Sequence, residues 1–189
     1  SYRSTTVNLG DNAPGVKAWK VMYRSTDSLG AANIVTGTVL VPTKMWSNIF
    51  QARPIVSYAV GTHGLAQGCA PSQQLEAGTD YETSNINAAL TAGYAVLVSD
   101  YQGYTNGATP TYLAGASQGN AVLDIVRAAS QIPSGGVSAN AKTAIWGYSQ
   151  GGQSAAWAAQ RHAAYAPSVN LVGVAAGGVP GDFLTTASY

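Results

Sequence analysis

The sequence predicts an α/β fold with a mostly parallel sheet, and three features support this. Four runs are short, rich in β-branched residues and almost entirely apolar, as is typical of parallel strands that are covered on both faces. Helical patterns separate these runs, so strand and helix alternate along the chain. The 189 residues are enough for one core and fit a single domain better than two. The expected strands are 54–60, 94–100, 143–148 and 170–178, and the expected helices are 83–92, 120–131 and 149–165.

Two further strands are expected before these, at 19–25 and 34–41, joined by the polar turn TDSLGAAN as a hairpin. Two long glycine-rich loops stand out, GTHGLAQGCAPSQQLEAGTDYE at 61–82 and YQGYTNGATPTYLAGASQG at 101–119. Each loop follows the carboxyl end of a predicted strand, which is where α/β sheets bind their ligands. We therefore expect the functional residues at this edge of the sheet.

The composition excludes several classes of partner. Charged residues make up 9% of the chain, the formal net charge is +1, and Lys and Arg form no cluster, so neither nucleic acid nor an anionic membrane surface is an expected partner. No apolar run approaches the roughly 20 residues of a membrane span. The first residues lack the pattern of a signal peptide, and the polar share is carried by Ser, Thr, Asn, Gln and Gly. These features favour a mature, secreted protein.

The segment TAIWGYSQGGQS, residues 143–154, carries the strongest chemical signal. Gly147-Tyr148-Ser149-Gln150-Gly151 matches G-x-S-x-G, with an apolar strand before it and a helix after it. Glycines two residues on either side of the serine let strand and helix approach closely at a sharp turn. The helix N-terminus places N–H groups and a positive dipole end beside the hydroxyl. The pattern predicts a nucleophile elbow with Ser149 as catalytic nucleophile; the alternative is a glycine-rich turn that only packs.

Acyl transfer also needs an oxyanion hole built from two N–H groups. The residue after the nucleophile, Gln150, is the predicted first donor. The second is expected in the loop that follows strand 54–60, where Gly64 is the candidate and His63 and Leu65 are alternatives. A plain tight turn is the competing interpretation of this loop.

The acid and the base of a triad are harder to find. The chain has two histidines: His63 precedes the nucleophile, against the chain order Ser, Asp or Glu, His, and His162 lies about four helical turns after Ser149. Downstream of Ser149 the one carboxylate is Asp182, for which a capping role is favoured. Asp100, at the end of strand 94–100, is expected to brace neighbouring loops through hydrogen bonds.

Taken together, these segments resemble the secretory lipase family of fungi and actinobacteria, a family of triacylglycerol lipases and esterases with the α/β-hydrolase fold. The resemblance rests on GTHGLAQGCAPS, SDYQGYT, GYSQGGQSAAWAA and AAGGVPGDF, in that order along the chain. It implies ester hydrolysis by a Ser-Asp-His triad without metal or cofactor, with Ser149 at the nucleophile position and Gln150 and Gly64 at the oxyanion positions.

In that family a lid follows the region that matches GGVPGDF, and the triad Asp and His come after the lid. The resemblance therefore implies that residues 1–189 form a single but incomplete α/β-hydrolase domain, its N-terminal portion, without the lid and the C-terminal triad segment. Cys69 is the single cysteine of the chain and has no internal partner. We expect a C-terminal segment of the same precursor, present as a second chain, to supply the Asp, the His and a cysteine that pairs with Cys69. A buried free thiol is the alternative.

The leading functional hypothesis is a secreted serine ester hydrolase that acts on lipids or other hydrophobic acyl esters through an acyl-enzyme on Ser149. One alternative is a catalytically inactive hydrolase fragment that binds acyl chains or a partner protein. A serine peptidase or an acyltransferase uses the same elbow and is the alternative among enzymes, because fold alone does not settle function.

Overall fold

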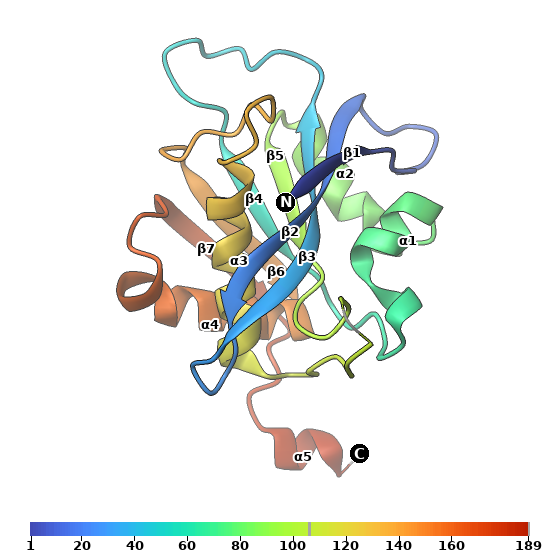
Figure 1. Cartoon of the computed structure of the whole chain (residues 1–189), viewed down its shortest axis with the longest axis vertical. Coiled ribbons are helices and arrows are strands. Elements are labelled where there is room, and N and C mark those ends of the chain that lie inside the picture. Colours follow the sequence, from blue (N-terminus) through green and yellow to red (C-terminus); the bar gives the residue numbers. More distant parts are fainter. Residues whose placement is uncertain (106, 189) are drawn as a thin grey trace.

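A mixed sheet with the strand order β1-β2-β3-β5-β4-β6-β7 forms the centre of the molecule (Figure 1). The computed structural model describes residues 1–105 and 107–188. The strands are β1 (Tyr2–Thr5), β2 (Val16–Thr26), β3 (Ala32–Pro42), β4 (Ile55–Ala59), β5 (Ala95–Ser99), β6 (Thr143–Tyr148) and β7 (Leu171–Gly177). The helices are the 3-10 turn η1 (Gln67–Cys69), α1 (Pro71–Ala77), α2 (Thr83–Thr91), α3 (Gly115–Ala129), α4 (Gln150–Tyr165) and α5 (Phe183–Ala187).

The sheet confirms the predicted fold class. Strands β5, β4, β6 and β7 are parallel neighbours, whereas β1, β2 and β3 pair antiparallel with one another and β3 pairs antiparallel with β5. Because β2 thereby runs in the same direction as the four parallel strands, only β1 and β3 oppose the others. The expected hairpin is present as β2 and β3.

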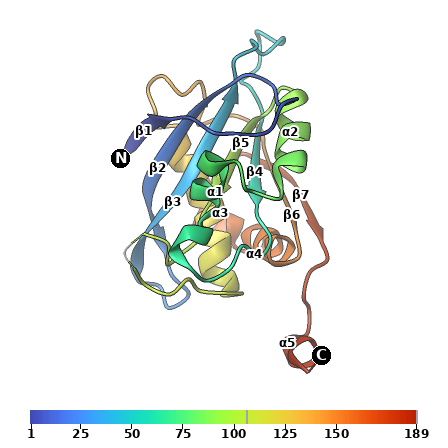
Figure 2. The same ribbon diagram turned by 90° about the vertical axis from the view of Figure 1, so that its right-hand side faces the viewer.

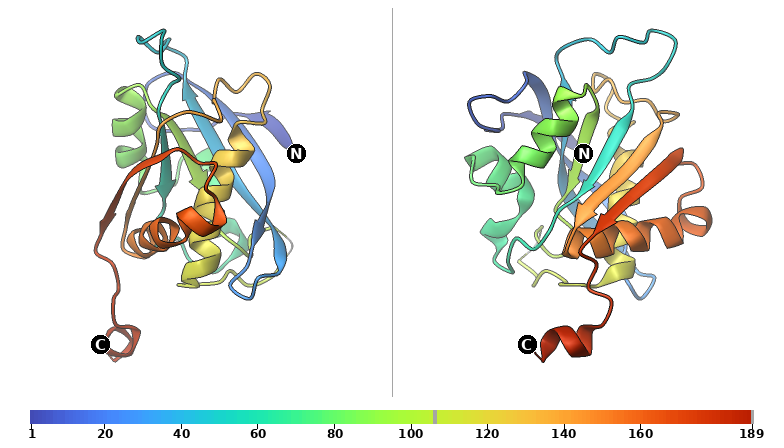
Figure 3. Two further views of the ribbon diagram at one scale, coloured as in Figure 1. Left: turned by 90° about the vertical axis from the view of Figure 1, so that its left-hand side faces the viewer. Right: turned by 180° about the vertical axis from the view of Figure 1, so that it is seen from behind.

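Helices cover both faces of the sheet. Helices α3 and α4 pack against each other on one face, and α1 and α2 lie on the other, as the right-hand view in Figure 3 shows. Strands β4 and β5 are buried along their whole length, which explains their continuous apolar sequences. Helix α5 lies apart from these layers (Figure 2).

Helix α3 begins at Gly115, five residues before the predicted start at residue 120. The sequence GASQG looks like a loop because glycine destabilises helices. A Cβ on Gly115 would lie 2.1 Å from Nε1 of Trp157, and a Cβ on Gly119 would lie 2.8 Å from the amide nitrogen of Ala158. The two glycines are therefore required by the close crossing of α3 and α4, which local sequence does not reveal.

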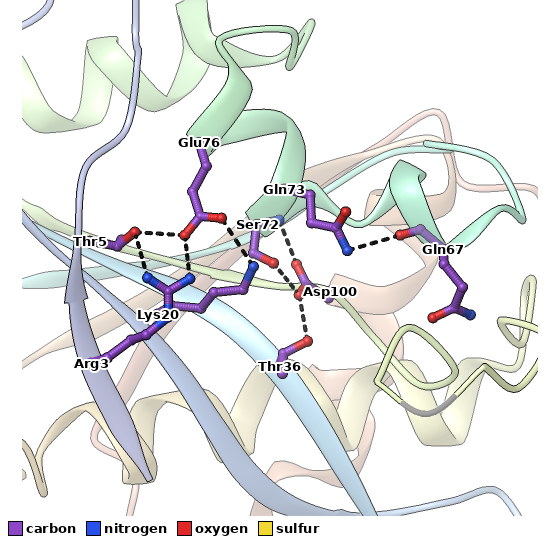
Figure 4. Close-up of polar contacts among 9 residues, drawn as sticks. All are labelled: Arg3, Thr5, Lys20, Thr36, Gln67, Ser72, Gln73, Glu76 and Asp100. Atoms are coloured by element: carbon purple, nitrogen blue, oxygen red, sulfur yellow. Dashed lines mark hydrogen bonds and ion pairs between the residues drawn. The ribbon is translucent and has the colours of Figure 1, made fainter.

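The first long loop is more ordered than expected, since it contains η1 and α1. Helix α1 is fixed to the sheet at both ends (Figure 4). Near its start, Asp100 at the end of β5 accepts hydrogen bonds from the amide and hydroxyl of Ser72, at 2.7 and 2.6 Å, and from the hydroxyl of Thr36 at 2.6 Å. Asp100 therefore braces neighbouring segments, as predicted from its position.

Towards the end of α1, Glu76 binds three side chains of the antiparallel strands. Its carboxylate accepts hydrogen bonds from Arg3 at 3.0 Å, Thr5 at 2.6 Å and Lys20 at 3.2 Å. Strand β1, which the sequence did not predict, is tied to the rest of the fold by this cluster and by its pairing with β2.

Replacing Ile125 by Ala should destabilise the fold. Ile125 is fully buried on α3, and its Cδ1 lies beside Gly37 of β3, so the change leaves a cavity between helix and sheet. Such substitutions cost about 2–5 kcal/mol of unfolding free energy, which urea denaturation measures. Met45→Ala, at a side chain that is 82% exposed, is the control and should change stability little. Equal midpoints for the two variants would contradict this account of the core.

Candidate active site

Ser149 lies at the turn between β6 and α4 and has an unusual backbone conformation. Its φ is 57° and its ψ is −123°, in a region that a residue with a Cβ occupies only when the surroundings force it. Its N–H donates to the carbonyl of Gly177 at the end of β7, at 3.0 Å. The strained conformation and this bond hold the serine at the carboxyl edge of the sheet.

Three glycines make the turn possible, each against a different backbone atom. A Cβ on Gly147 would lie 2.3 Å from the carbonyl oxygen of Gly151. A Cβ on Gly151 would lie 1.9 Å from the oxygen of Ala59, and one on Gly152 would lie 2.1 Å from the oxygen of Gly177. Because backbone atoms cannot move aside as flexible side chains do, side chains at these positions are excluded. This geometry is that of a nucleophile elbow.

The hydroxyl of Ser149 is not used to stabilise helix α4. Ser149 occupies the N-cap position, where a serine side chain usually accepts a bond from the first-turn N–H groups, but no such bond forms. The side chain is partly exposed, next to Tyr148, which is 63% exposed. The N-terminal N–H groups and the positive end of the helix dipole therefore remain directed at the space beside the serine.

Gly64 and Gln150, the two predicted oxyanion donors, line the same small cavity. Leu65 and Tyr104 contribute to its wall. Gly64 has a φ of 107°, which only glycine adopts readily, so the backbone there turns in a way that no other residue permits without strain. The structure thus brings the two candidate donors to one cavity. Which N–H of this loop is the second donor stays a prediction.

The loop that carries Gly64 is fixed by side chains from the segment just before α2. Glu82 accepts the N–H of Gly61 at 2.9 Å and the hydroxyl of Tyr58 at 3.1 Å. The hydroxyl of Tyr81 donates to the carbonyl of Thr62 at 3.0 Å. Sequence reasoning missed this role of residues 80–82, because the triplet DYE before a helix has no motif that distinguishes it from an ordinary helix start.

His63 belongs to the same cluster and not to a catalytic pair with Ser149. Its Nε2 lies 3.0 Å from Oδ2 of Asp80 and its Nδ1 lies 3.0 Å from the carbonyl oxygen of Gly61. The side chains of His63 and Asp80 are 2% and 0% exposed. Since both neighbours are acceptors, the ring is best satisfied when it is protonated and donates from both nitrogens. This agrees with the prediction that His63 is misplaced for the base.

The pKa of His63 is raised in the folded protein. Burial alone would lower this pKa, but the hydrogen bonds to Asp80 and Gly61 and the charges of Asp80 and Glu82 outweigh it. Burial also raises the pKa of Glu82, against the hydrogen bond from Gly61 and the charge of His63. Through these buried hydrogen bonds, His63 supports the loop that carries Gly64.

The remaining candidates for acid and base have structural roles. His162, in the last turn of α4, places its Nε2 2.7 Å from the carbonyl oxygen of Val169. Asp182 caps α5, accepting the N–H groups of Leu184 at 3.0 Å and Thr185 at 3.2 Å. The capping role of Asp182 is the one expected from the sequence.

Cys69 lies next to the loop that carries Gly64. It ends η1, is half-buried, and its Sγ lies 2.9 Å from the point where a Cβ on Gly64 would be. Among the described residues its thiol is free. The predicted disulfide therefore stays a prediction.

Replacing His63 by Gln should change how stability depends on pH. A raised pKa in the folded state means that the contribution of His63 is complete below its unfolded pKa of about 6.5 and is lost as the pH rises through the folded value. The difference in unfolding free energy between wild type and His63→Gln should thus shrink from about pH 6 to about pH 8. Urea denaturation at both pH values measures it. A difference that does not depend on pH would refute a protonated His63.

The described part of the chain contains no helix that is long and apolar enough to cross a membrane.

Two proteins known from their sequences and one solved structure show what the chain is similar to. The secreted triacylglycerol lipase LIP7 of Malassezia globosa is 35% identical over 173 residues, which are 87% of this chain and 35% of that protein. A probable inactive lipase of Mycobacterium tuberculosis, MT1628, is 34% identical over 176 residues, which are 88% of this chain and 38% of that protein.

The crystal structure of Candida antarctica lipase A matches the whole chain and 43% of its own, with a TM-score of 0.81 and 30% identity. The chain spans less than two fifths of the length of the curated relatives that it matches. The family model for secretory lipases matches residues 69–188, which include the elbow and β7. With this match over more than half of its length, the chain belongs to the secretory lipase family.

Proposed function

We propose that this chain carries the nucleophile and the oxyanion hole of a serine ester hydrolase. The observation that carries the proposal is the strained Ser149 at the start of α4, whose hydroxyl caps nothing. The next residue, Gln150, lines a small cavity together with Gly64. A turn that serves only packing has no need of a strained serine at this position. Membership of the secretory lipase family supports the same chemistry.

In the proposed reaction, Oγ of Ser149 attacks the ester carbonyl carbon while a histidine takes the hydroxyl proton. The carbonyl oxygen becomes an oxyanion and accepts the N–H of Gln150 and an N–H of the Gly64 loop. Collapse of the tetrahedral intermediate breaks the bond to the alcohol, which leaves with the proton from the histidine. Water then attacks the acyl-enzyme by the same route and releases the carboxylic acid.

The triad acid and histidine of this proposal come from outside residues 1–189. His63 and His162 are bound to other groups, and Asp182 is a helix cap. The family resemblance places both residues after the region that matches GGVPGDF. A segment after residue 189 that supplies both groups is part of the proposal. It would explain why no base lies beside Ser149 among the described residues.

The proposed substrates are hydrophobic acyl esters such as triacylglycerols, and the proposed location is extracellular. Both follow the description of the family as secretory lipases and the name of the Malassezia relative, a secreted triacylglycerol lipase. A substrate panel of triacylglycerols, short esters and peptides separates lipase from esterase and from peptidase activity.

A second candidate is an inactive hydrolase that binds acyl chains or a protein. The similarity to a probable inactive lipase of Mycobacterium tuberculosis favours it, since that protein is about as similar to this chain as the Malassezia lipase. A fluorophosphonate probe distinguishes the two, because it modifies a serine only when a base activates it.

In the full-length protein, which includes the segment that supplies the acid and the base, Ser149→Ala should abolish hydrolysis of a short p-nitrophenyl ester and leave the fold intact. Loss of the nucleophile costs on the order of 10⁶ in kcat, and alanine keeps the Cβ that the turn already accommodates. Ser134→Ala, at an exposed position, is the control. The wild type should be labelled by the fluorophosphonate and Ser149→Ala should not. A folded wild type that stays unlabelled would favour the inactive hydrolase.

We also propose that Cys69 forms a disulfide with a cysteine of the segment that supplies the acid and the base. Its place beside Gly64 would tie that segment to the oxyanion loop. On a gel of the native protein, reductant should release a second species, and Cys69→Ser should release it without reductant. One species with the mass of this chain in both lanes, with esterase activity intact, would overturn the disulfide and the separate segment together.

A further inference from the structure

The proposed oxyanion loop, residues 61–66, follows the end of β4 and pairs with no strand of the described residues. Its carbonyl groups are instead bound one by one by side chains: Gly61 by His63, Thr62 by Tyr81, and Gly64 by Tyr104. The first two donors come from the loop itself or from the segment before α2. Tyr104 comes from the second glycine-rich loop, after β5, and thus links two separate parts of the chain.

Tyr104 is well suited to this bond. It is half-buried, and it lines the same cavity as Gly64 and Gln150. Burial, with smaller effects from Cys69 and Asp100, raises its pKa to about 12, so its hydroxyl stays protonated and donates at neutral pH. The acceptor is the carbonyl of a glycine at φ 107°, a backbone position with little steric restraint of its own.

Gln67 makes the opposite connection. It belongs to η1 on the first loop, and its Nε2 donates to the carbonyl of Gly103 at 2.8 Å and to that of Ala108 at 2.7 Å. Gly103 directly precedes Tyr104, so Gln67 fixes the backbone from which the tyrosine extends. Each loop therefore gives one side chain to the backbone of the other.

We propose that Tyr104 is a positioning residue for the oxyanion hole, acting with Gln67 as a clasp between the two loops. An oxyanion donor must be held 2.7–3.1 Å from an oxygen that exists only in the transition state. Tyr104 holds the carbonyl of the Gly64–Leu65 peptide, which carries the N–H of Leu65 and follows the N–H of Gly64. Free rotation of this peptide therefore weakens catalysis more than it weakens binding. The hydroxyl of Tyr104 acts through Gly64, whose carbonyl it binds. The inference rests on the proposed function, since it concerns the rate of the same reaction.

The test is Tyr104→Phe in the active enzyme, which removes one hydroxyl and keeps the ring. Loss of an oxyanion donor costs about 10²–10³ in kcat, and loosening one costs less, so we expect kcat to fall about tenfold with KM changed less than about twofold. Tyr94→Phe is the control, because its ring packs on Trp46 and its hydroxyl makes no bond to either loop. Both variants should unfold at the wild-type urea concentration to within a small shift.

A second measurement does not depend on activity. Amide hydrogen exchange of peptides that cover residues 61–66 should be faster in Tyr104→Phe than in wild type and unchanged in Tyr94→Phe. If the wild type neither hydrolyses esters nor reacts with a fluorophosphonate, the proposed function fails, and the exchange still tests the clasp. Unchanged exchange in Tyr104→Phe overturns the clasp, and faster exchange with an unchanged kcat overturns the positioning role.

The partnership with Gln67 is tested by a double-mutant cycle. Gln67→Ala frees the backbone at Gly103, so it should lower kcat in the same direction as Tyr104→Phe. If the two side chains act as one clasp, the double variant should lose little more activity than the more damaging single variant. If the fold-loss of kcat in the double variant equals the product of the two single fold-losses, the side chains act independently, and the clasp is overturned.

Discussion

Direct backbone contact between the first turn of α4 and the ends of the neighbouring strands is the constraint on which the rest of the site depends. Gly151 lies against the carbonyl of Ala59 at the end of β4, and Gly152 lies against that of Gly177 at the end of β7. This contact forces the turn at Ser149 into its strained conformation. Because Gly61 follows Ala59 by two residues, the same contact brings the oxyanion loop to the serine. The same backbone contacts thus position the proposed nucleophile, the N-terminus of α4 and the loop that carries Gly64.

Much of this arrangement was predictable, because it depends on local signals. Continuous apolar runs identified the parallel strands, and G-x-S-x-G between a strand and a helix identified the elbow. The positions of Asp100 at a strand end and Asp182 before a short helix likewise indicated their bracing and capping roles, which the structure confirms. In each case the chemical requirement lies within a few residues of the group that meets it.

The features that were missed depend on contacts between distant segments. The predicted start of α3 is five residues too late, because Gly115 and Gly119 taken alone favour a loop. Only their close contact with Trp157 of α4 explains why glycines occur in the first turns of this helix. Strand β1 is largely exposed and lacks an apolar pattern, so its existence depends on β2 and Glu76. The proposed role of Tyr104 could not be predicted, because it depends on a contact with Gly64, which is 40 residues away in another loop.

The loops around the site are held mainly by neutral side chains. Tyrosine hydroxyls and a glutamine amide keep their hydrogen bonds over a wide range of pH and salt, whereas exposed ion pairs weaken as salt screens them. Burial raises the pKa of Tyr81 and of Tyr104 to about 12, which extends that range. The low content of charged residues is therefore compatible with firmly held loops. The exceptions are buried acidic groups: Asp80 with His63, Glu82 with Gly61, and Asp100 with Ser72.

Ser149 stands where a helix-capping residue belongs, and yet its side chain caps none of the first N–H groups of α4. Helix ends in this condition favour an anion, and a tetrahedral oxyanion covalently attached to the serine would meet those groups directly. Such an adduct would then complete the helix as well as occupy the site. Trapped phosphonate or boronate adducts should accordingly make the protein harder to unfold, so that inhibition and thermal protection would report the same event.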